Sequence, residues 1–337
     1  MGIYAKNNYL DFDWIVSRSG PFCFIVGARG VGKTYGAIKY VLENNIKFLF
    51  MRRRQNEIEM LSSPDTNPLK ANTGDITVKS INKNMFGFYD TDEDGRPEGS
   101  PRGYMCALST ISKLRGFDMQ DVNILIFDEF IGEAHDTPIK QEGKAFLNAY
   151  ETINRNRELD GLQPLKVLAL ANSNELANPI FMELGIVTAA EKMSITGNQY
   201  YNDAARGITI IMPSGSRISE AKKETALYKA AAGSGFEDMA IANKFEGYTA
   251  DNVAPQPLGE YRPVAFLGEL GIYRHKSARR FYICSHRAGA AKEYRTGADD
   301  LKRARHDLYY LRVAFLNNRI YFDSYLNKVL FEKYLDI

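Results

Sequence analysis

The octapeptide at residues 27–34 restricts the fold of this chain more than any other segment. It matches the phosphate-binding pattern G-x-x-x-x-G-K-[ST] at every fixed position, namely Gly27, Gly32, Lys33 and Thr34. The apolar run before it is typical of a buried parallel strand, and apolar residues after it recur at helical spacing. Glycines let backbone N–H groups curl around a phosphate, and a helix N-terminus adds partial positive charge. The segment therefore predicts a strand, a phosphate-binding turn and a helix.

The whole turn is a candidate for binding ATP, and its residues are Gly27, Ala28, Arg29, Gly30, Val31, Gly32, Lys33 and Thr34. We expect Lys33 to neutralise the β- and γ-phosphates and Thr34 to offer its hydroxyl to Mg²⁺. A simple phosphate cradle needs no internal charge, so Arg29 could contact the γ-phosphate or a neighbouring subunit. The alternative is a glycine-rich turn without a ligand. The strand and helix predicted on either side disfavour it.

Two carboxylates follow a second apolar run, at residues 124–127. Asp128 is the expected acidic partner of the turn and would hold Mg²⁺ together with Thr34. Glu129 would orient and deprotonate the water that attacks the γ-phosphate. This second acid indicates a hydrolysing ATPase and not a kinase or a GTPase. The alternative is a pair of acids that caps a helix after an apolar strand, and the upstream turn disfavours it.

Other polar residues stand at element ends where they could complete an ATP site. Asn172 follows the apolar run 166–171 and could contact the γ-phosphate or the attacking water, although a turn-forming Asn is the alternative. Arg155 and Arg157 close a helix predicted at residues 141–159. They are candidates for an arginine finger on the next subunit's ATP, or for cations that complement their own helix C-terminus.

Two further groups of arginines have open roles. Arg115 lies upstream of Asp128 and is a second candidate for action in trans. The triple Arg52-Arg53-Arg54 follows a strand predicted at residues 47–51 and could face ATP or DNA.

Short apolar runs alternate with helical stretches over the first 200 residues, which indicates an α/β fold with a parallel sheet. We predict a P-loop ATPase domain at 1–200, a linker region at 201–257 with one helix at 219–232, and a basic α+β domain at 258–337. In the first domain we expect a hairpin at 76–89, loops at 62–74 and 90–103, and strands at 47–51, 104–108, 124–127 and 166–171. In the last, three strands precede a helix-rich tail at 299–335.

The net charge is only +2, but the basic residues are concentrated towards the C-terminus. Residues 262–305 hold eleven Lys or Arg against four Asp or Glu, a net charge of +7, whereas the rest of the chain carries −5. Such a segment indicates a polyanionic partner, or else a solvated basic face. Candidate contacts to DNA or RNA within it are Arg279, Arg280 and Arg303.

The composition disfavours membrane and secreted proteins. No stretch approaches about 18 consecutive apolar residues, and the N-terminus lacks the apolar core of a signal peptide. The three cysteines, Cys23, Cys106 and Cys284, are too scattered for a disulfide framework or a zinc site. We therefore expect a reducing, cytoplasmic location and no membrane partner.

Several short segments resemble, in the same order, the DNA-packaging ATPase of phi29-like bacteriophages, a small terminase-like packaging motor. They are residues 24–34, 51–53, 126–131, 154–158, 170–173 and 178–179. The resemblance is strongest over residues 20–185 and weaker towards the C-terminus.

This resemblance implies a motor that uses ATP and Mg²⁺ to pump double-stranded DNA into an empty procapsid. The family works as a homomeric ring, usually a pentamer, on the portal vertex, with a structural packaging RNA between ring and portal. It implies an ATPase domain of the additional-strand catalytic glutamate class, with a RecA-like parallel sheet. The C-terminal domain would be RNase H-like and without a nuclease site. The protein would act in the host cytoplasm, transiently at the portal vertex, and be absent from the mature virion.

Carried over residue by residue, the resemblance implies that Lys33 and Thr34 bind phosphate and Mg²⁺. It assigns hydrolysis to Asp128 and Glu129, and the finger acting in trans to Arg155. Nuclease activity is not expected, because the C-terminal segment shows no trio of carboxylates for two metals.

Two positions of the resemblance bear on contacts between subunits. Arg115 falls where the family also places a basic residue. Gln55 stands where a family member has Lys, which puts a trans role for that position in doubt.

Two other functions stay open. One is a cellular-type P-loop ATPase, such as a helicase or another nucleic-acid motor, which would not depend on a portal. The other is a binding module in which ATP fixes a conformation with little turnover. Glu129 argues against this second alternative, because such a module has no use for a general base.

Overall fold

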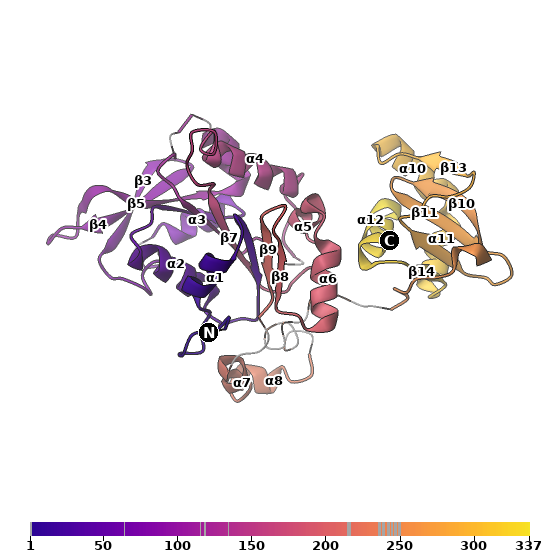
Figure 1. The fold of residues 1–337 in the computed structure, drawn as a ribbon, viewed down its shortest axis with the longest axis horizontal. Helices are drawn as coiled ribbons and strands as arrows, with labels where there is room; N and C mark the ends of the chain where they lie inside the picture. The colour runs from indigo at the N-terminus through magenta and orange to yellow at the C-terminus, as the bar shows by residue number, and fades with distance from the viewer. Residues whose placement is uncertain are drawn as a thin grey trace. The chain divides into compact units, whose positions relative to one another are not determined.

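The computed structural model describes residues 2–63, 65–114, 116, 117, 119–133, 135–213, 217–234, 237, 240, 243, 245, 248 and 251–337. The chain forms two compact units, Met1–Tyr248 and Thr249–Ile337 (Figure 1). Each unit has its own sheet and its own hydrophobic core.

In its described residues the first unit contains a nine-stranded sheet, in the order β3-β4-β5-β2-β6-β7-β1-β9-β8. The strands are β1 (Phe22–Val26), β2 (Phe48–Arg52), β3 (Ile76–Asn82), β4 (Met85–Thr91), β5 (Pro97–Ala107), β6 (Ile124–Asp128), β7 (Lys166–Ala171), β8 (Tyr200–Asp203) and β9 (Ile208–Ile211). From β5 to β9 the neighbours in this order pair in parallel, while β3, β4 and β8 pair antiparallel at the two edges.

The strand order brings the predicted site residues to one edge of the sheet. β7 lies between β1, which leads into the phosphate-binding turn, and β6, which ends at Asp128. The register pairs Val26 of β1 with Ala171 of β7, and Asp128 of β6 with Leu170. Because these strands are parallel, the turn, the two acids and Asn172 all lie at or directly after carboxyl ends, where ligands of open α/β sheets bind.

Helices cover both faces of this sheet (Figure 1). Because side chains alternate across a strand, Cys23 and Ile25 of β1 share one core cluster with α2, while Phe24 contacts Phe146 of α4 and Phe181 of α5. The continuous apolar runs of the sequence are therefore explained by burial on both faces. The helices are α1 (Phe12–Arg18), α2 (Lys33–Glu43), α3 (Gln55–Leu61), α4 (Glu142–Asn154), α5 (Pro179–Leu184), α6 (Val187–Thr196), α7 (Arg217–Lys223) and α8 (Ala226–Ala230), with a 3₁₀ segment η1 (Leu108–Leu114).

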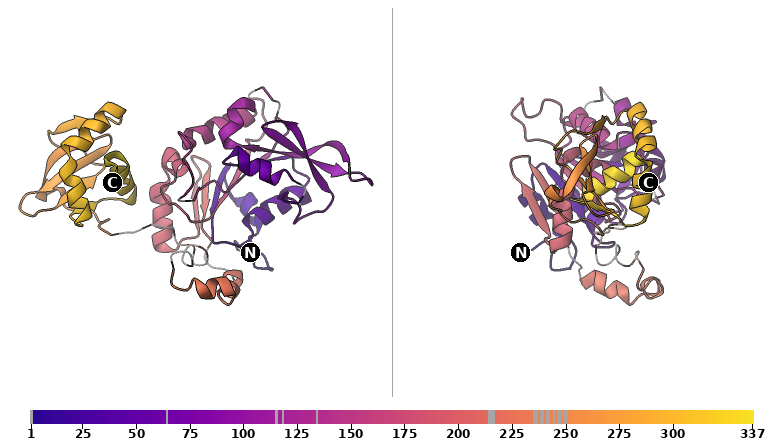
Figure 2. Two further views of the ribbon diagram at one scale, coloured as in Figure 1. Left: turned by 180° about the vertical axis from the view of Figure 1, so that it is seen from behind. Right: turned by 90° about the vertical axis from the view of Figure 1, so that its right-hand side faces the viewer.

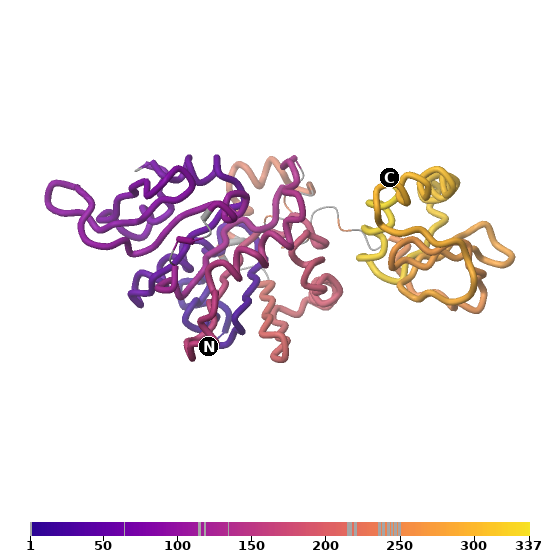
Figure 3. The backbone as a smooth tube through the Cα atoms, turned by 90° about the horizontal axis from the view of Figure 1, so that it is seen from above, coloured from indigo at the N-terminus to yellow at the C-terminus, as the bar shows by residue number. Residues whose placement is uncertain are grey.

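The β4–β5 hairpin is longer than the sequence indicated. β5 begins at Pro97 and not at residue 104, so much of the loop predicted at 90–103 is strand, and that prediction is wrong. The Gly, Pro and charged residues of this stretch pair with β4 outside the core, so they lack the alternation by which a strand is predicted. Figure 2 and Figure 3 show the hairpin as an arm that projects from the first unit.

The first unit also extends beyond the boundary predicted at residue 200. β9 pairs with β1 and β8 pairs with β9, so part of the predicted linker belongs to the sheet. Strands of four residues are too short for a periodic pattern to reveal, and only their pairing identifies them. Two helix predictions also change: that at 219–232 becomes α7 and α8, and α4 ends at Asn154 and not at residue 159.

The second unit has a five-stranded sheet in its described residues, in the order β13-β10-β11-β12-β14. β10, β11 and β12 pair antiparallel, and β13 and β14 add in parallel to β10 and β12. Three helices share the core with one face of this sheet. The elements are η2 (Leu258–Glu260), β10 (Tyr261–Leu267), β11 (Leu270–His275), β12 (Phe281–Cys284), β13 (Lys292–Tyr294), α10 (Ala298–Asp307), α11 (Tyr309–Leu316), β14 (Ile320–Phe322) and α12 (Tyr325–Leu335). Among the helices described in either unit, none is long and apolar enough to cross a membrane.

Candidate nucleotide-binding site

The phosphate-binding turn has the strand–turn–helix form that the sequence predicted. β1 ends at Val26, and α2 begins at Lys33. Gly30 and Gly32 both have a φ of +83°, a conformation that residues with a Cβ rarely adopt. A Cβ on Gly32 would also lie 2.5 Å from the ring of Tyr9, which packs on the turn. The backbone therefore requires both glycines, and the turn leads into a helix N-terminus, where anions bind.

Lys33 links the turn to the end of β7. Its Nζ donates hydrogen bonds to the carbonyl oxygens of Gly27 at 2.7 Å and Ala28 at 2.9 Å. A third bond, at 3.0 Å, goes to Oδ1 of Asn172. The structure thus brings Asn172 to the lysine that is expected to neutralise the phosphates.

The surroundings of Lys33 weaken its hold on a proton. Burial lowers the pKa of Lys33 to about 8; Asp128 opposes this shift, and the charges of Arg29 and Lys222 add to it. A lysine that is partly buried among other cations gains more from a bound anion than an exposed lysine does.

Thr34 and Asp128, which were predicted to hold Mg²⁺, lie side by side in the structure. Thr34 Oγ1 donates to Oδ1 of Asp128 at 2.8 Å. The Asp128 carboxylate is buried, and its Oδ2 accepts no hydrogen bond from the described residues, although Nη2 of Arg52 lies 2.8 Å away. A buried carboxylate oxygen beside a hydroxyl suits Mg²⁺, which is a hard cation that takes oxygen ligands. The residues present therefore fit this metal.

Glu129 lies directly after β6, with a φ of 54°. Its side chain is 57 % exposed and forms an ion pair with Nη1 of Arg52. The same guanidinium faces Asp128, so Arg52 contacts both acids. Desolvation raises the pKa of Glu129, and the charge of Arg52 acts in the opposite direction.

The role of Arg52 is open in the sequence, and the structure places its guanidinium beside both acids of the site. Arg52 is the last residue of β2, and β2 pairs in parallel with β6. The end of β2 therefore lies beside the acids that end β6. The signal in the sequence was a cation directly after a buried strand, but only the strand order shows which neighbour it meets.

A single cavity of about 360 Å³ is lined by most of the predicted residues. Across it, Nη2 of Arg29 pairs with Oε1 of Glu133 at 3.0 Å, a partner that sequence reasoning missed. Gly27, Ala28 and Val31 belong to the turn but not to this lining. The lining residues are Arg29, Gly30, Gly32, Lys33, Thr34, Tyr35, Asp128, Glu129, Glu133, Leu170, Ala171 and Asn172.

Arg155 is not part of this cavity. It directly follows α4, and its Nη2 donates to the carbonyl oxygen of Phe117 at 2.7 Å. Arg115, the second residue predicted to act in trans, lies outside the described residues.

Arg157 is a structural residue, which contradicts its predicted role as a contact to a neighbour, DNA or RNA. It is only 5 % exposed. Its guanidinium donates to the carbonyl oxygens of Gln120 and Gln163, each at 3.2 Å, and of Val122. These bonds hold the segment that leads into β6, so the guanidinium is not available to a ligand.

The three consecutive arginines have three different surroundings. Arg53 is buried, and its Nε and Nη2 bind the two carboxylate oxygens of Glu142 at 2.6 and 2.9 Å. Its Nη1 pairs with Asp136 at 2.8 Å. Arg54 directly precedes α3. Of the triple, only Arg52 contacts the acids of the site, so Arg53 has a structural role.

In the second unit, arginines line a cavity of about 530 Å³, called here the arginine cleft. Arg262 and Arg274 stand opposite each other on β10 and β11, where like charges repel. None of the four arginines in the cleft forms an ion pair within the described part of the chain. The lining residues are Arg262, Pro263, Val264, Arg274, Arg279, Phe281, Tyr310, Val313, Ala314 and Arg319.

The predicted nucleic-acid contacts of this unit differ in their surroundings. Arg279 lines the arginine cleft. The guanidinium of Arg280 lies over the ring of Tyr321 at 5.8 Å, and 3.7 Å from Glu260. Arg303 forms an ion pair with Asp300 in its own helix. Arg279 is thus the candidate with the least compensated charge.

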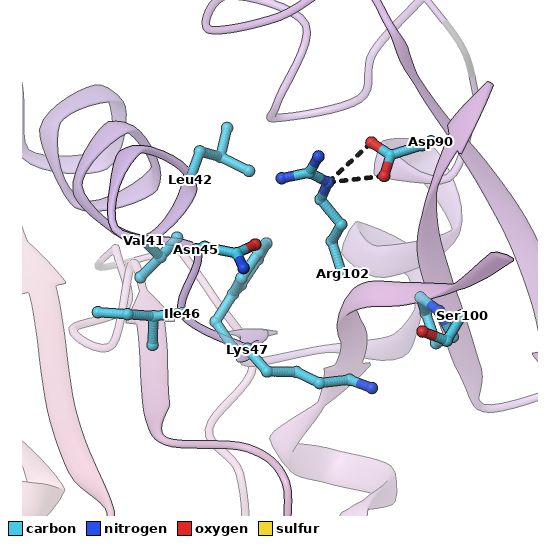
Figure 4. Close-up of a pocket in the computed structure, with 10 residues that line it drawn as sticks. Val41, Leu42, Asn45, Ile46, Lys47, Asp90, Ser100 and Arg102 are labelled. Carbon is cyan, nitrogen blue, oxygen red and sulfur yellow. Dashed lines mark hydrogen bonds and ion pairs between the residues drawn. The ribbon is translucent and has the colours of Figure 1, made fainter. Parts of the chain in front are cut away.

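Another cavity of the first unit, of about 320 Å³, lies near the start of β2 (Figure 4). There Nε of Arg102 contacts both carboxylate oxygens of Asp90, at 2.7 and 2.8 Å (Figure 4). Phe48, the first residue of β2, is part of its lining. Ligands of open parallel sheets bind at the carboxyl ends of the strands, so this cavity is not the candidate site.

The family described as Podovirus DNA encapsidation protein (Gp16) matches residues 4–254 of this chain. A DNA packaging protein of Bacillus phage phi29 is 25 % identical over 252 residues, which cover 72 % of this chain and 66 % of that protein. The values for the DNA packaging protein of Bacillus phage PZA are the same, so this chain spans 66 % of the length of both relatives. A DNA packaging protein of Bacillus phage B103 is 24 % identical over 328 residues, which cover 91 % of this chain and 94 % of that protein.

Two solved structures resemble this one over nearly the whole chain. A chain of the bacteriophage Phi-29 viral genome packaging motor assembly has a TM-score of 0.69 at 18 % identity, covering 97 % of this chain and 98 % of that chain. A chain of the Phi-28 gp11 DNA packaging motor has a TM-score of 0.65 at 20 % identity, covering 98 % and 99 %. At these identities the likeness shows a shared fold.

Proposed function

Because this chain belongs to the podovirus DNA encapsidation protein (Gp16) family, we propose that it is an ATP-driven motor that moves double-stranded viral DNA into a procapsid. One observation carries the proposal. A phosphate-binding turn, a buried Asp and an exposed Glu line one cavity at the carboxyl edge of a parallel sheet. A cellular-type ATPase, such as a helicase, is not favoured, because the family match extends over residues 4–254.

Four residues of the cavity have separate parts in the proposed hydrolysis. Lys33 would bind the β- and γ-phosphates, and Thr34 and Asp128 would hold Mg²⁺, which supplies positive charge against the phosphates when it is bound. Glu129 takes a proton from the attacking water, and its raised pKa strengthens it as a base. Because Arg52 is paired with Glu129, this ion pair has to open before the carboxylate accepts a proton.

We further assign the first unit to the additional-strand catalytic glutamate class. The position of β7 between β1 and β6 supports this assignment, and so does the contact of Asn172 with Lys33. For the second unit we propose an RNase H-like domain that binds nucleic acid and does not cut it. Its single α+β sheet and the arginine cleft support this proposal.

The motor is proposed to work as a homomeric ring, expected to be a pentamer, at the portal vertex in the host cell. Its partners would be double-stranded DNA, the portal and a structural packaging RNA. Arg155 lies outside the cavity of its own chain, as a finger that completes a neighbour's site requires. The four cleft arginines without ion pairs in the described residues suit a phosphate backbone.

The direct test is ATP hydrolysis by the purified chain with DNA and purified procapsids, with and without added packaging RNA. We expect hydrolysis to rise only when procapsid and RNA are both present, and DNA to become protected from nuclease inside the capsids. Lys33→Ala should abolish both signals. A rate of hydrolysis that does not change when procapsids are added, together with strand separation of free DNA, would instead support a helicase function.

A further inference from the structure

Lys222 brings a cation to the phosphate-binding turn from outside the sequence motif. It lies in the last turn of α7, in the part of the chain that sequence reasoning assigned to a linker. Its Nζ donates a hydrogen bond to the carbonyl oxygen of Arg29 at 3.0 Å. A Cβ placed on Gly30 would lie only 2.0 Å from the same nitrogen. The ammonium group therefore lies directly against the middle of the turn.

The charge of Lys222 is not balanced by a carboxylate among the described residues, where it forms no ion pair. Burial and the charge of Arg29 lower the pKa of Lys222. Its own charge in turn lowers the pKa of Lys33. Three cations thus act on one turn, and an anion bound there would relieve their mutual repulsion.

Two residues that follow Lys222 in the chain, Ala240 and Asn243, also make hydrogen bonds to the turn or to the end of β1. The N–H of Arg29 donates to the carbonyl oxygen of Ala240 at 3.1 Å. Nδ2 of Asn243 donates to the carbonyl oxygens of Val26 and Pro213, both at 3.1 Å. Lys222, Ala240 and Asn243 therefore each contact the turn or the end of β1.

We propose that Lys222 binds the terminal phosphate of a nucleoside triphosphate held by the turn, an inference that rests on the proposed ATP-binding function. Lys33 reaches the β- and γ-phosphates in sites of this type. Lys222 lies against Gly30 and is bonded to the carbonyl oxygen of Arg29, so its ammonium group is beside the turn that would hold the same phosphates. Binding of a triphosphate would then be transmitted to α7, in the part of the chain that follows the sheet.

A structural role is the competing explanation, in which Lys222 only ties α7 to the turn through its bond to Arg29. Glutamine separates the two roles, because its amide can still donate to a carbonyl oxygen but carries no charge. Arginine keeps the charge. Lys223, the next residue and an exposed one, provides the matched control.

The experiment is calorimetric titration of the full-length chain with ATPγS and with ADP, both with Mg²⁺. We expect Lys222→Gln to weaken ATPγS binding about tenfold and ADP binding less than about twofold, because a charge-assisted bond to the terminal phosphate is lost. Lys222→Arg should stay within about threefold of the wild type, and Lys223→Gln should not change either affinity. Hydrogen exchange at residues 217–223 should slow with ATPγS more than with ADP.

Equal affinities of Lys222→Gln and wild type for ATPγS would overturn the inference. An equal loss for both nucleotides would also overturn it, since that is the result of a structural tie. Either of these two results leaves the proposed function intact, provided that the wild-type chain binds ATPγS and Lys33→Ala does not. If the wild-type chain bound no ATPγS, the proposed function would fail, and this inference with it.

Discussion

Asp128 and Glu129 are adjacent in the chain, yet they lie in different environments. Asp128 is buried and accepts a hydrogen bond from Thr34, whereas the Glu129 side chain is 57 % exposed. A buried carboxylate suits a metal, and one that reaches solvent can exchange a proton with water. At the scale of single residues, burial therefore distinguishes the two neighbouring acids in the way that their two proposed roles require, and Arg52 contacts both.

Glu129→Gln should separate ATP binding from turnover. We expect the affinity for ATP to stay within about twofold and kcat to fall by at least about 100-fold, because the amide cannot take a proton. Phosphate release and calorimetric titration measure the two quantities. Glu133→Gln, in the same cavity, is the control and should keep most of the turnover. If hydrolysis survived Glu129→Gln, another group would be the base.

The pKa of Lys33, lowered to about 8, predicts how ATP affinity depends on pH. Below this pKa the lysine is already protonated, so its contribution does not change with pH. Above it, phosphate binding must be accompanied by uptake of a proton, so the affinity falls by up to about tenfold per pH unit. Titration between about pH 7 and 9.5, in buffers of different ionisation enthalpy, measures affinity and proton uptake together. An affinity that stays constant over this range would contradict the lowered pKa.

At the scale of elements, one ion pair fastens α4 to the sheet edge that carries the site. Arg53 follows β2 directly, and Glu142 is the first residue of α4. Their contact is bidentate and both side chains are buried. The pair therefore sets how α4 meets the sheet, one residue away from the Arg52 contacts to the acids.

Glu142→Ala should destabilise the first unit by about 3–5 kcal/mol, because it leaves the buried Arg53 charge without its main partner. The double replacement Arg53→Met with Glu142→Leu should recover most of this loss, since apolar residues fill a similar volume without a charge. Urea unfolding followed by circular dichroism measures the free energy of unfolding. The exposed pair of Lys70 and Asp65 is the control, and Asp65→Ala should change stability little. If Glu142→Ala and Asp65→Ala lowered the free energy of unfolding equally, the structural role of the Arg53–Glu142 pair would be contradicted.

At the scale of the whole molecule, the cavity beside the phosphate-binding turn and the arginine cleft lie in different units. A motor of the proposed kind needs both, one to hydrolyse ATP and one to hold nucleic acid. It also needs a side chain that reaches the ATP site of the neighbouring subunit. Among the described residues, Arg155 is the candidate for this role.

Mixing two inactive variants tests action in trans. Lys33→Ala loses the phosphate contact of its own site, and Arg155→Ala loses the finger offered to a neighbour. In mixed rings, some interfaces combine one subunit with an intact phosphate-binding turn and a neighbour with an intact Arg155. We therefore expect part of the ATPase activity to return. Arg157→Ala should instead lower stability without complementation, because its guanidinium binds its own chain. Mixed rings no more active than either variant alone would count against a trans role of Arg155.

Replacing Arg262, Arg274 and Arg319 by Ala in the full chain should remove contacts to phosphates. Nucleic-acid binding should then become weaker and less dependent on salt. Each lost phosphate contact should reduce the slope of log K against log salt by about 0.9 on duplex DNA. Fluorescence anisotropy at several salt concentrations measures this slope. Arg303→Ala is the control, because Arg303 is paired with Asp300 and should change the slope less. An unchanged slope in the triple variant would exclude the cleft as the binding surface.

The sequence by itself was sufficient for the parts of this protein that depend on local pattern. The position of the turn at 27–34, of Asp128 and Glu129, and of Asn172 at the ends of buried strands could be predicted, because each follows an apolar run that a buried parallel strand requires. Their roles in catalysis remain predictions. The same runs predicted β1, β2, β6 and β7 to within a residue. Parallel strands end at one edge, so the predicted residues meet there.

Only the tertiary structure decided which distant side chains complete the site and which do not. Arg52 reaches the acids because β2 pairs with β6, and Lys222 reaches the turn from a helix that the sequence predicted inside a linker region. Arg157 was predicted as a ligand contact and is instead bound to carbonyl oxygens of its own chain. A cation on a surface and a cation buried against carbonyls look alike in a sequence, because burial and pairing depend on neighbours that only the fold brings into contact.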